Sequence, residues 1–421
     1  MTTTDTLIVG GGQAGLALSR CLTSLGRDHL VLERGRIAER WRSERWASLR
    51  LLTPNWMTRL PGWAYDGEDP DGFMAAPEVA SFFDRYAASF DAPVLQESVV
   101  QRVSTRGDGF AVATDDREHR ARNVVIATGW CDRPAVPAWA GRLSGRIHQL
   151  HPSSYQSPAD LPHGGVLVVG ASATGLQLAD ELQSSGREVT LAVGNHRRAP
   201  RRYRGMDIFW WLELIGSFEK TIDDVDDIIA ARTEPSLGVV GRPDHSTLDL
   251  ATLAANGVRI VGRALDGDGT RLSLGTDVRR LVDTADRQMA GLLGRIDQAI
   301  EQFGLTAEVL DPEPIPSLTM RSIPDSIDLA AVGIETIVWA TGYRRGYEWL
   351  DLPLLDHRGE IAQHRGVTCI PGAYVLGQRF QHFRNSNFID GVGRDATFVA
   401  EHICRRDSVD RCRASVTFEQ K

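Results

Sequence analysis

Three glycines and one glutamate near the start of the chain have the types and spacing that bind a diphosphate-linked dinucleotide. Gly10, Gly12 and Gly15 form a G-x-G-x-x-G pattern, and Glu33 follows at the end of the next apolar run. The first glycine permits a tight turn, the second lets the backbone approach a pyrophosphate, and the third allows close helix–strand packing. A carboxylate at the position of Glu33 accepts from both ribose hydroxyls. The other candidate cofactor contacts of this segment are Gln13, Ala14 and Arg34.

These residues need a strand, a turn and a helix to hold them. Residues 6–9 are an apolar run that predicts a buried parallel strand. Residues 16–25 have helical spacing and stop at a glycine, and residues 29–32 predict the second strand. The helix would present its free N–H groups and positive end to a diphosphate. A lone glycine motif is weak evidence, but the complete unit with its acid is strong.

The same pattern returns 160 residues later with informative differences. Gly170 and Gly175 repeat the outer glycines, while Ser172 replaces the middle one and Val193 stands where the first unit has its acid. Ala173 and Thr174 complete the candidate contacts of this turn.

Two arginines soon after the second unit favour NADP over NAD. Arg197 and Arg198 follow the second strand of that unit. Guanidinium groups bind a 2′-phosphate that a carboxylate would repel. The alternative is that some of these arginines cover a surface or line a domain interface.

Two short segments repeat another pattern. Apolar strands end in Ala127-Thr128-Gly129 and in Ala340-Thr341-Gly342, where small residues let a turn pass close to a bound dinucleotide. The second copy predicts that the chain returns to the first domain. The predicted fold class is α/β with two nested Rossmann-like dinucleotide-binding domains. The first domain comprises residues 1–149 and 336–421, and the second comprises residues 150–335, with a helical elaboration at about 205–330.

Composition narrows the class of protein. The net charge of −8 argues against a nucleic-acid partner, and no apolar stretch approaches the length of a membrane span. No basic leader is present before residue 6, so we expect a cytoplasmic protein. The five cysteines include no CxxC pair, which argues against a dithiol centre and a metal site. The aromatic run at residues 209–211 offers an apolar surface for a homodimer.

The whole constellation resembles the flavin-containing monooxygenase superfamily, in particular a bacterial branch of CzcO-like oxidoreductases related to plant YUCCA enzymes and Baeyer–Villiger monooxygenases. The resemblance covers almost the whole chain. It rests on the glycine turns, Glu33, the Trp41-Arg42 pair, residues 49–54 and the two Ala-Thr-Gly segments. Gly145, His148 and Tyr155 resemble a shortened form of the superfamily fingerprint FxGxxxHxxxY.

The resemblance implies an FAD enzyme that consumes NADPH and O₂. A C4a-(hydro)peroxyflavin would oxygenate nitrogen, sulfur or a ketone in a small organic substrate. The implied cofactor contacts also include Val100, and the groups expected near the isoalloxazine are Trp41, Arg42, Thr53, Asn55, Asn387 and Phe388. Of these, Arg42, Thr53 and Asn55 are the candidate catalytic residues. The alternatives are an NAD(P)H-dependent flavin reductase or dehydrogenase without oxygen transfer, and a non-catalytic redox sensor. The sequence does not name the substrate.

Overall fold

The first of two sheets is built from both ends of the chain. The computed structural model describes residues 2–320 and 322–418. The sheet has ten strands, and its parallel centre places β1 between β2 and β8, with β24 added beside β8. Its strands are β1 (Thr2–Val9), β2 (His29–Leu32), β5 (Val94–Leu95), β6 (Val100–Arg106), β7 (Gly109–Thr114), β8 (Glu118–Ile126), β21 (Leu350–Asp351), β22 (Gln363–His364), β23 (Val367–Thr368) and β24 (Ala373–Val375).

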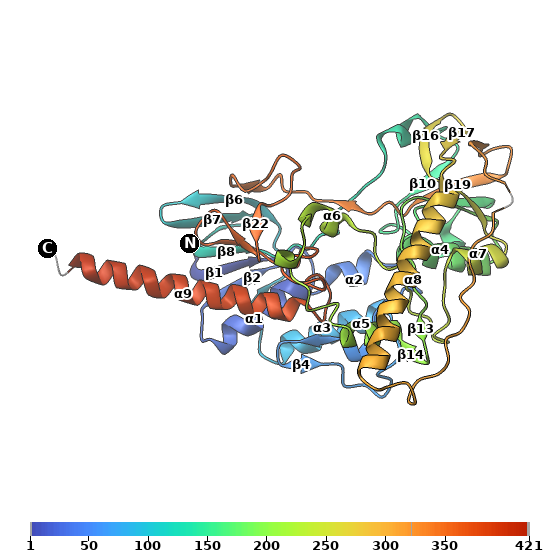
Figure 1. Cartoon of the computed structure of the whole chain (residues 1–421). Helices are drawn as coiled ribbons and strands as arrows, with labels where there is room; N and C mark the ends of the chain where they lie inside the picture. The colour runs from blue at the N-terminus through green and yellow to red at the C-terminus, as the bar shows by residue number, and fades with distance from the viewer. Residues whose placement is uncertain (1, 321, 419–421) are drawn as a thin grey trace.

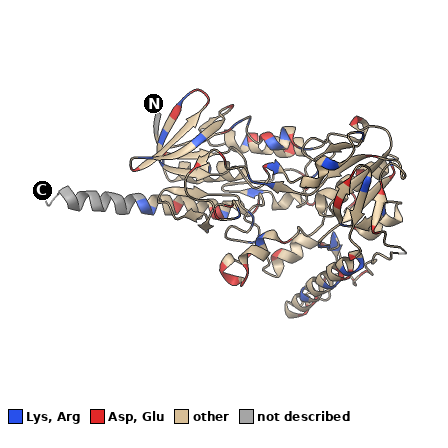
Figure 2. Ribbon diagram, turned by 90° about the horizontal axis from the view of Figure 1, so that it is seen from above, with Lys and Arg blue, Asp and Glu red and all other residues tan. Residues whose placement is uncertain are grey.

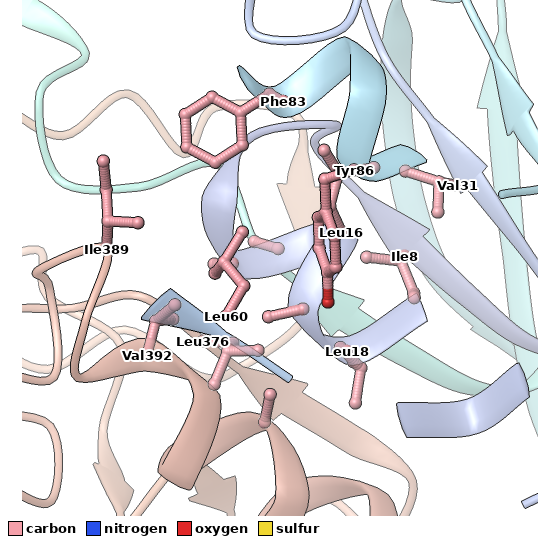
Figure 3. Close-up of a cluster of buried hydrophobic side chains, with 14 of the residues drawn as sticks. Ile8, Leu16, Leu18, Val31, Leu60, Phe83, Tyr86, Leu376, Ile389 and Val392 are labelled. Carbon is pink, nitrogen blue, oxygen red and sulfur yellow. The ribbon is translucent and has the colours of Figure 1, made fainter. Parts of the chain in front are cut away.

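Helices cover this sheet because their apolar faces meet the buried strand residues. The helices of this half are α1 (Gln13–Ser24), α2 (Glu39–Ser43), α3 (Ala76–Ala88) and α9 (Val392–Phe418). Ile8, Leu16 and Val392 are fully buried in one cluster that joins β1, α1 and α9, and Phe83 and Tyr86 of α3 close it (Figure 3). The first glycine turn therefore rests on a packed core.

The second sheet has five strands, and all of its pairings are parallel. Its order is β10-β19-β11-β12-β15. The strands are β10 (His148–Leu150), β11 (Gly165–Val169), β12 (Val189–Val193), β15 (Arg259–Gly262) and β19 (Ile334–Trp339), and its helices are α4 (Ala173–Ser184) and α7 (Leu250–Ala255). All residues of β11 and β12 are buried, as an apolar run in a parallel sheet requires. Figure 1 shows the two sheets side by side, with α9 at the first and α4 and α7 at the second.

One predicted boundary is wrong. The sequence placed residues 336–340 in the first domain, but β19 pairs with β10 and β11 in the second sheet. The strand is a copy of β8 within its own unit, because Ala340 packs on Gly170 as Ala127 packs on Gly10. The chain returns to the first sheet only after residue 340.

The region expected to be a helical elaboration contains both helices and strands. It contains α5 (Ile208–Leu214), α6 (Ile228–Thr233) and the long α8 (Val278–Gln302), in agreement with the helices expected there. It also contains β15 of the second sheet. The other strands of the region are β14 (Met206–Asp207), β16 (Ala264–Asp268), β17 (Arg271–Leu274) and β18 (Ser326–Asp328), and β13 (Arg202–Tyr203) just before the region pairs with β14.

Both passages of the chain between the sheets run side by side. The outgoing passage holds β9 (Arg133–Pro134), and the returning one holds β20 (Tyr343–Arg344). These two strands pair antiparallel. The remaining short elements are β3 (Arg59–Leu60), β4 (Trp63–Ala64) and the 3₁₀ turns η1 (Asn55–Met57), η2 (Ala138–Arg142), η3 (Pro158–Asp160) and η4 (Ile222–Asp224). Among the described residues, no helix has the length and apolar character to span a bilayer.

Candidate functional site

Both glycine turns open into one cavity of about 1750 Å³. A pocket for a single small ligand is typically about 300–1000 Å³, so this cavity has room for more than one. The chain as a whole carries a net charge of −8, yet the described lining residues include eleven basic and five acidic side chains. The cavity is therefore suited to anionic ligands. In Figure 2, blue segments lie in the middle of the molecule, between its two halves.

The first turn has the geometry that its glycines predict. Gly10 has a φ of +112°, and a Cβ there would lie 2.6 Å from the carbonyl oxygen of Ala127. A Cβ on Gly15 would lie 1.9 Å from the carbonyl oxygen of Gly10. A Cβ on Gly12 would meet nothing within 4 Å, so this position faces open space at the start of α1. The first and third glycines permit packing, and the second leaves room for a ligand.

Backbone hydrogen bonds fix the side chain of Glu33, the residue directly after β2. Its Oε2 accepts from the backbone N–H of Gly11 at 2.6 Å, and its Oε1 accepts from that of Gly35 at 3.0 Å. The side chain is buried and lines the cavity. The backbone thus orients the carboxylate toward the space beside the first turn.

The C-terminal turn, residues 377–391, packs onto the first glycine turn. The Gln13 side chain donates to the carbonyl oxygen of Asn387 at 2.8 Å. Gly377 has a φ of +83°, and a Cβ there would lie 2.8 Å from the Cβ of Ala14. Both Asn387 and Phe388 line the cavity, so the tail returns to the first glycine turn.

The second turn repeats the first. A Cβ on Gly170 would lie 2.4 Å from the carbonyl oxygen of Ala340, and one on Gly175 would lie 1.8 Å from that of Gly170. Ser172, Ala173 and Thr174 line the cavity at the start of α4. The substitution of serine for the middle glycine leaves the turn geometry intact.

The arginines near the second turn do not lie as predicted. Arg198 is buried and pairs with Asp249 and Asp286, both at 2.8 Å, so it does not reach the cavity. Arg197 lines the cavity but pairs with Glu234 at 2.7 Å. The prediction for Arg198 is wrong because neighbouring carboxylates of α7 and α8 take its guanidinium.

Arg263 is the residue that sequence reasoning missed. It follows β15 and lines the cavity, with its guanidinium carbon 3.4 Å from the place where Gly194 would carry a Cβ. Its Nη2 donates to Asn195 at 2.9 Å. Because β15 pairs with β12, the residue after its end lies beside the end of β12. Extending the second unit by one more strand would have identified it.

Two residues expected near the isoalloxazine lie elsewhere. Arg42 donates to the carbonyl oxygen of Ile37 at 3.1 Å and pairs with Asp84, away from the lining. Asn55 is buried, donating to the carbonyl oxygen of Asp69 and accepting from the N–H of Met74. Asn55 fixes the loop before α3, and Arg42 joins α2 to α3, so neither is a cavity group. Sequence type alone does not distinguish a buried amide that fixes a loop from one that faces a ligand.

Most other candidates line the cavity. The lining residues among the first-turn and C-terminal candidates are Gly10, Gly12, Gln13, Ala14, Glu33, Arg34, Trp41, Thr53, Val100, Ala127, Thr128, Gly129, Asn387 and Phe388. Those of the second turn are Gly170, Ser172, Ala173, Thr174, Arg197, Thr341 and Gly342. Gly15 and Gly175 lie behind the turns and act through packing.

Two titratable groups of the lining are neutral at neutral pH. Burial raises the pKa of the Cys131 thiol, although nearby arginines, Arg45 first, oppose the shift. Burial lowers the pKa of His151, whose Nε2 lies 3.1 Å from the carbonyl oxygen of Gly342. His151 therefore supports the second Ala-Thr-Gly segment. No sequence motif predicted this role for His151, which is only a histidine in the outgoing passage.

Comparisons with known proteins agree with this geometry. Residues 7–207 match the family described as pyridine nucleotide-disulphide oxidoreductase. An uncharacterized CzcO-like oxidoreductase of Geobacillus kaustophilus is 31% identical over 403 residues, which cover 95% of this chain and 98% of the relative.

Two solved structures have a similar fold. A flavin-containing monooxygenase from Stenotrophomonas maltophilia matches with a TM-score of 0.67 and 20% identity, over 96% of this chain and 99% of that one. The OTEMO complex with FAD and NADP matches with a TM-score of 0.55 and 16% identity, over 98% and 86% of the two chains. The predicted resemblance is confirmed: the chain belongs to the CzcO-like oxidoreductases and has the fold of the flavin-containing monooxygenases.

Proposed function

We propose that this oxidoreductase binds FAD and NADPH and transfers one oxygen atom from O₂ to a small organic substrate. The observation that carries the proposal is that two strand–turn–helix units, each with the spacing for a diphosphate, face one cavity large enough for two dinucleotides and a substrate. The OTEMO structure, which holds FAD and NADP, has the same fold and supports this assignment.

FAD would lie along the first turn. The N–H groups at the start of α1 and the open face of Gly12 would receive its diphosphate, and Glu33 its ribose hydroxyls. The domain that we propose for FAD consists of the first sheet and the C-terminal turn. It is interrupted by an NADP domain built on the second sheet, between β10 and β19.

NADPH would lie along the second turn. The start of α4 would receive its diphosphate, with Ser172 able to donate from its hydroxyl. Arg263 at the end of β15 would meet the 2′-phosphate, in place of the acid that the first unit has at the end of β2. We therefore propose a preference for NADPH over NADH.

When bound, FAD supplies the electron transfer from NADPH and the activation of O₂. The chain positions the reactants and excludes water. Trp41, Thr53 and Phe388 line the cavity between the two turns, and the Gln13–Asn387 hydrogen bond fixes the C-terminal turn against the FAD site. Cys131 is the one described cysteine that lines the cavity, so the part of the chain that is described offers no dithiol partner for it.

Two measurements on the purified holoenzyme test the proposal. NADPH added without oxygen should bleach the flavin, and under an atmosphere of ¹⁸O₂ an aryl sulfide or ketone should gain one labelled oxygen per NADPH consumed, the other oxygen atom leaving as water. Bleaching followed by stoichiometric H₂O₂ release, with no labelled product across sulfides, amines and ketones, would favour the alternative of a reductase without oxygen transfer. A colourless protein, or a flavin that NADPH does not bleach, would contradict both.

A further inference from the structure

Two cavity-lining arginines pair with a single carboxylate at the end of the cavity lined by α5, α8 and the C-terminal turn, and a third arginine lies near them. Arg197 pairs with one oxygen of Glu234 at 2.7 Å, and Arg384 pairs with the other at 2.6 Å. Arg295 of α8 completes the group, and all four side chains line the cavity. We call Arg197, Arg295 and Arg384 the arginine group.

The charges of the arginine group are not balanced within the described chain. Burial lowers the pKa of Arg197, and both Arg384 and Arg295 lower it further, while Glu234 opposes the shift. The two neighbouring cations are therefore close enough to repel Arg197. Arg295 donates to the carbonyl oxygen of Gly291, one turn earlier in α8, and no described carboxylate forms an ion pair with it. Three guanidinium groups against one carboxylate leave an excess of positive charge in a partly desolvated space, which a bound anion would relieve.

An apolar wall lies at the same end of the cavity. Phe209, Phe218 and Phe388 form a triangle of rings with centroids 6.1–6.4 Å apart. All three line the cavity, together with Leu212, Ile215 and Leu292. A flat apolar group would pack against these rings while its charged end faced the arginine group.

Arg295 and Arg384 lie on other elements than the proposed phosphate end of the NADPH site, whereas Arg197 is two residues from Asn195, which Arg263 contacts. Arg384 belongs to the C-terminal turn, three residues before Asn387, which contacts the first glycine turn. Arg263 instead lies at the end of β15, beside the second unit. The arginine group thus lies where a substrate beside the flavin would be held, given the proposed function on which this inference rests.

We propose that the substrate is an organic carboxylic acid with an aromatic or similarly flat apolar body. Its carboxylate is bound by Arg197, Arg295 and Arg384, and its body packs against Phe209, Phe218 and Phe388. Planar guanidinium groups suit this role because they bind a carboxylate with two parallel hydrogen bonds. Glu234 holds two of the arginines in place and competes with the ligand for them.

The test compares 2-naphthylacetate with its neutral analogue 2-naphthylacetamide by calorimetric titration of the holoenzyme. The acid should bind at least tenfold more tightly than the amide, since charge-assisted hydrogen bonds are worth about one factor of ten or more each. Arg295→Gln should remove most of this preference and leave amide binding unchanged. Glu234→Gln should increase the preference, because it removes the competing anion.

Arg287→Gln is the matched control, since Arg287 is an exposed residue two turns earlier on α8 and lies outside the lining. It should behave as the unaltered protein does. Equal binding of acid and amide, or an Arg295→Gln effect equal on both, would overturn the proposal. So would an Arg295→Gln variant that loses affinity for NADPH instead. If the acid preference persists but NADPH fails to bleach the flavin, the proposed function fails and the anion site stands.

Discussion

Glu33 combines two tasks, since it accepts from two backbone N–H groups and is our candidate for binding the ribose. Its carboxylate accepts from Gly11 and Gly35, and these bonds aim it at the proposed ribose position. Glu33→Ala should lower the flavin content after dialysis severalfold, because a carboxylate that accepts from charged or polar donors contributes about 1.5–3 kcal/mol. The ratio of flavin absorbance to protein absorbance measures this. A circular dichroism spectrum like that of the unaltered protein should show that the fold persists, and unchanged flavin content would refute the ribose role.

Arg263 and Arg198 form a matched pair that tests the phosphate assignment. Arg263→Gln should raise the KM for NADPH at least tenfold and leave that for NADH unchanged, since only NADPH carries the 2′-phosphate. Arg198→Gln should leave the ratio of the two constants unchanged. It should instead lower the free energy of unfolding by about 3 kcal/mol, because Asp249 stays buried without its cation. A larger effect of Arg198→Gln on the KM ratio would reverse the assignment.

The sequence predicts the residues of the turns well and the long side chains less well. Gly10 and Gly15 are constrained by the backbone of their own unit, so their spacing alone determines what they do. Arg198 and Arg42 find partners on α7, α8 and α3, far away in the sequence. A flexible cation takes whichever carboxylate the fold brings near, and one sequence does not reveal which that is.

At the scale of elements, α9 begins with a buried acid. Asp395 in its first turn is fully buried, and burial raises the pKa of this carboxyl to about 7, with the Ser386 hydroxyl and Arg394 opposing. The pKa of this carboxyl in the folded state is above the ordinary value near 4. Its contribution to the free energy of unfolding is therefore fully present below pH 4. It is lost as the pH rises through 7.

Asp395→Asn should remove this pH dependence. The raised pKa of Asp395 corresponds to at most about 4 kcal/mol of the free energy of unfolding. Urea unfolding at pH 5 and pH 8 should show the unaltered protein losing stability relative to the variant at the higher pH. Because an oxygen of Asp395 lies 3.8 Å from Nδ1 of His382 in the C-terminal turn, flavin retention should follow the same trend. Parallel stability profiles of the two proteins would contradict the assignment.

The elements themselves were predicted unevenly, for a physical reason. The strands and helices of both glycine units follow from local apolar spacing and were predicted. The partners of β19 were not, because its pairing with β10 and β11 joins segments that are far apart in the sequence, such as His148 with Thr336 and Val166 with Thr336. The three-stranded sheet of β16, β17 and β18 also lay within a region read as helical, since short strands give weak periodicity.

At the scale of the whole molecule, Arg201 joins the two halves. It is almost fully buried, lies over the rings of Phe73 and Phe209 at 4.9 and 5.1 Å, and donates to the carbonyl oxygen of Leu52 at 2.7 Å. It also pairs with Asp207, the N-cap of α5. The loop before α3 is thus bonded to the elaboration of the second half.

Arg201→Gln should lower the free energy of unfolding by about 3–5 kcal/mol, because it leaves Asp207 without its cation. Thermal or urea unfolding measures the change. Arg202→Gln is the control: Arg202 is exposed, so its substitution should change the free energy of unfolding by no more than about 0.5 kcal/mol. Equal effects of the two substitutions would show that Arg201 does not tie the halves together.

The paired strands β9 and β20 have a consequence for how the halves could move. The outgoing and returning passages are fastened to each other, with the N–H of Ala135 donating to the carbonyl oxygen of Gly342 at 2.9 Å. Two separate linkers would let the two halves slide and twist relative to each other in several directions. One paired ribbon would restrict the two halves to rotation about a single hinge. Substrate entry and product release would then use the same hinge motion, and the bonds made by Arg201 would hold the two halves together.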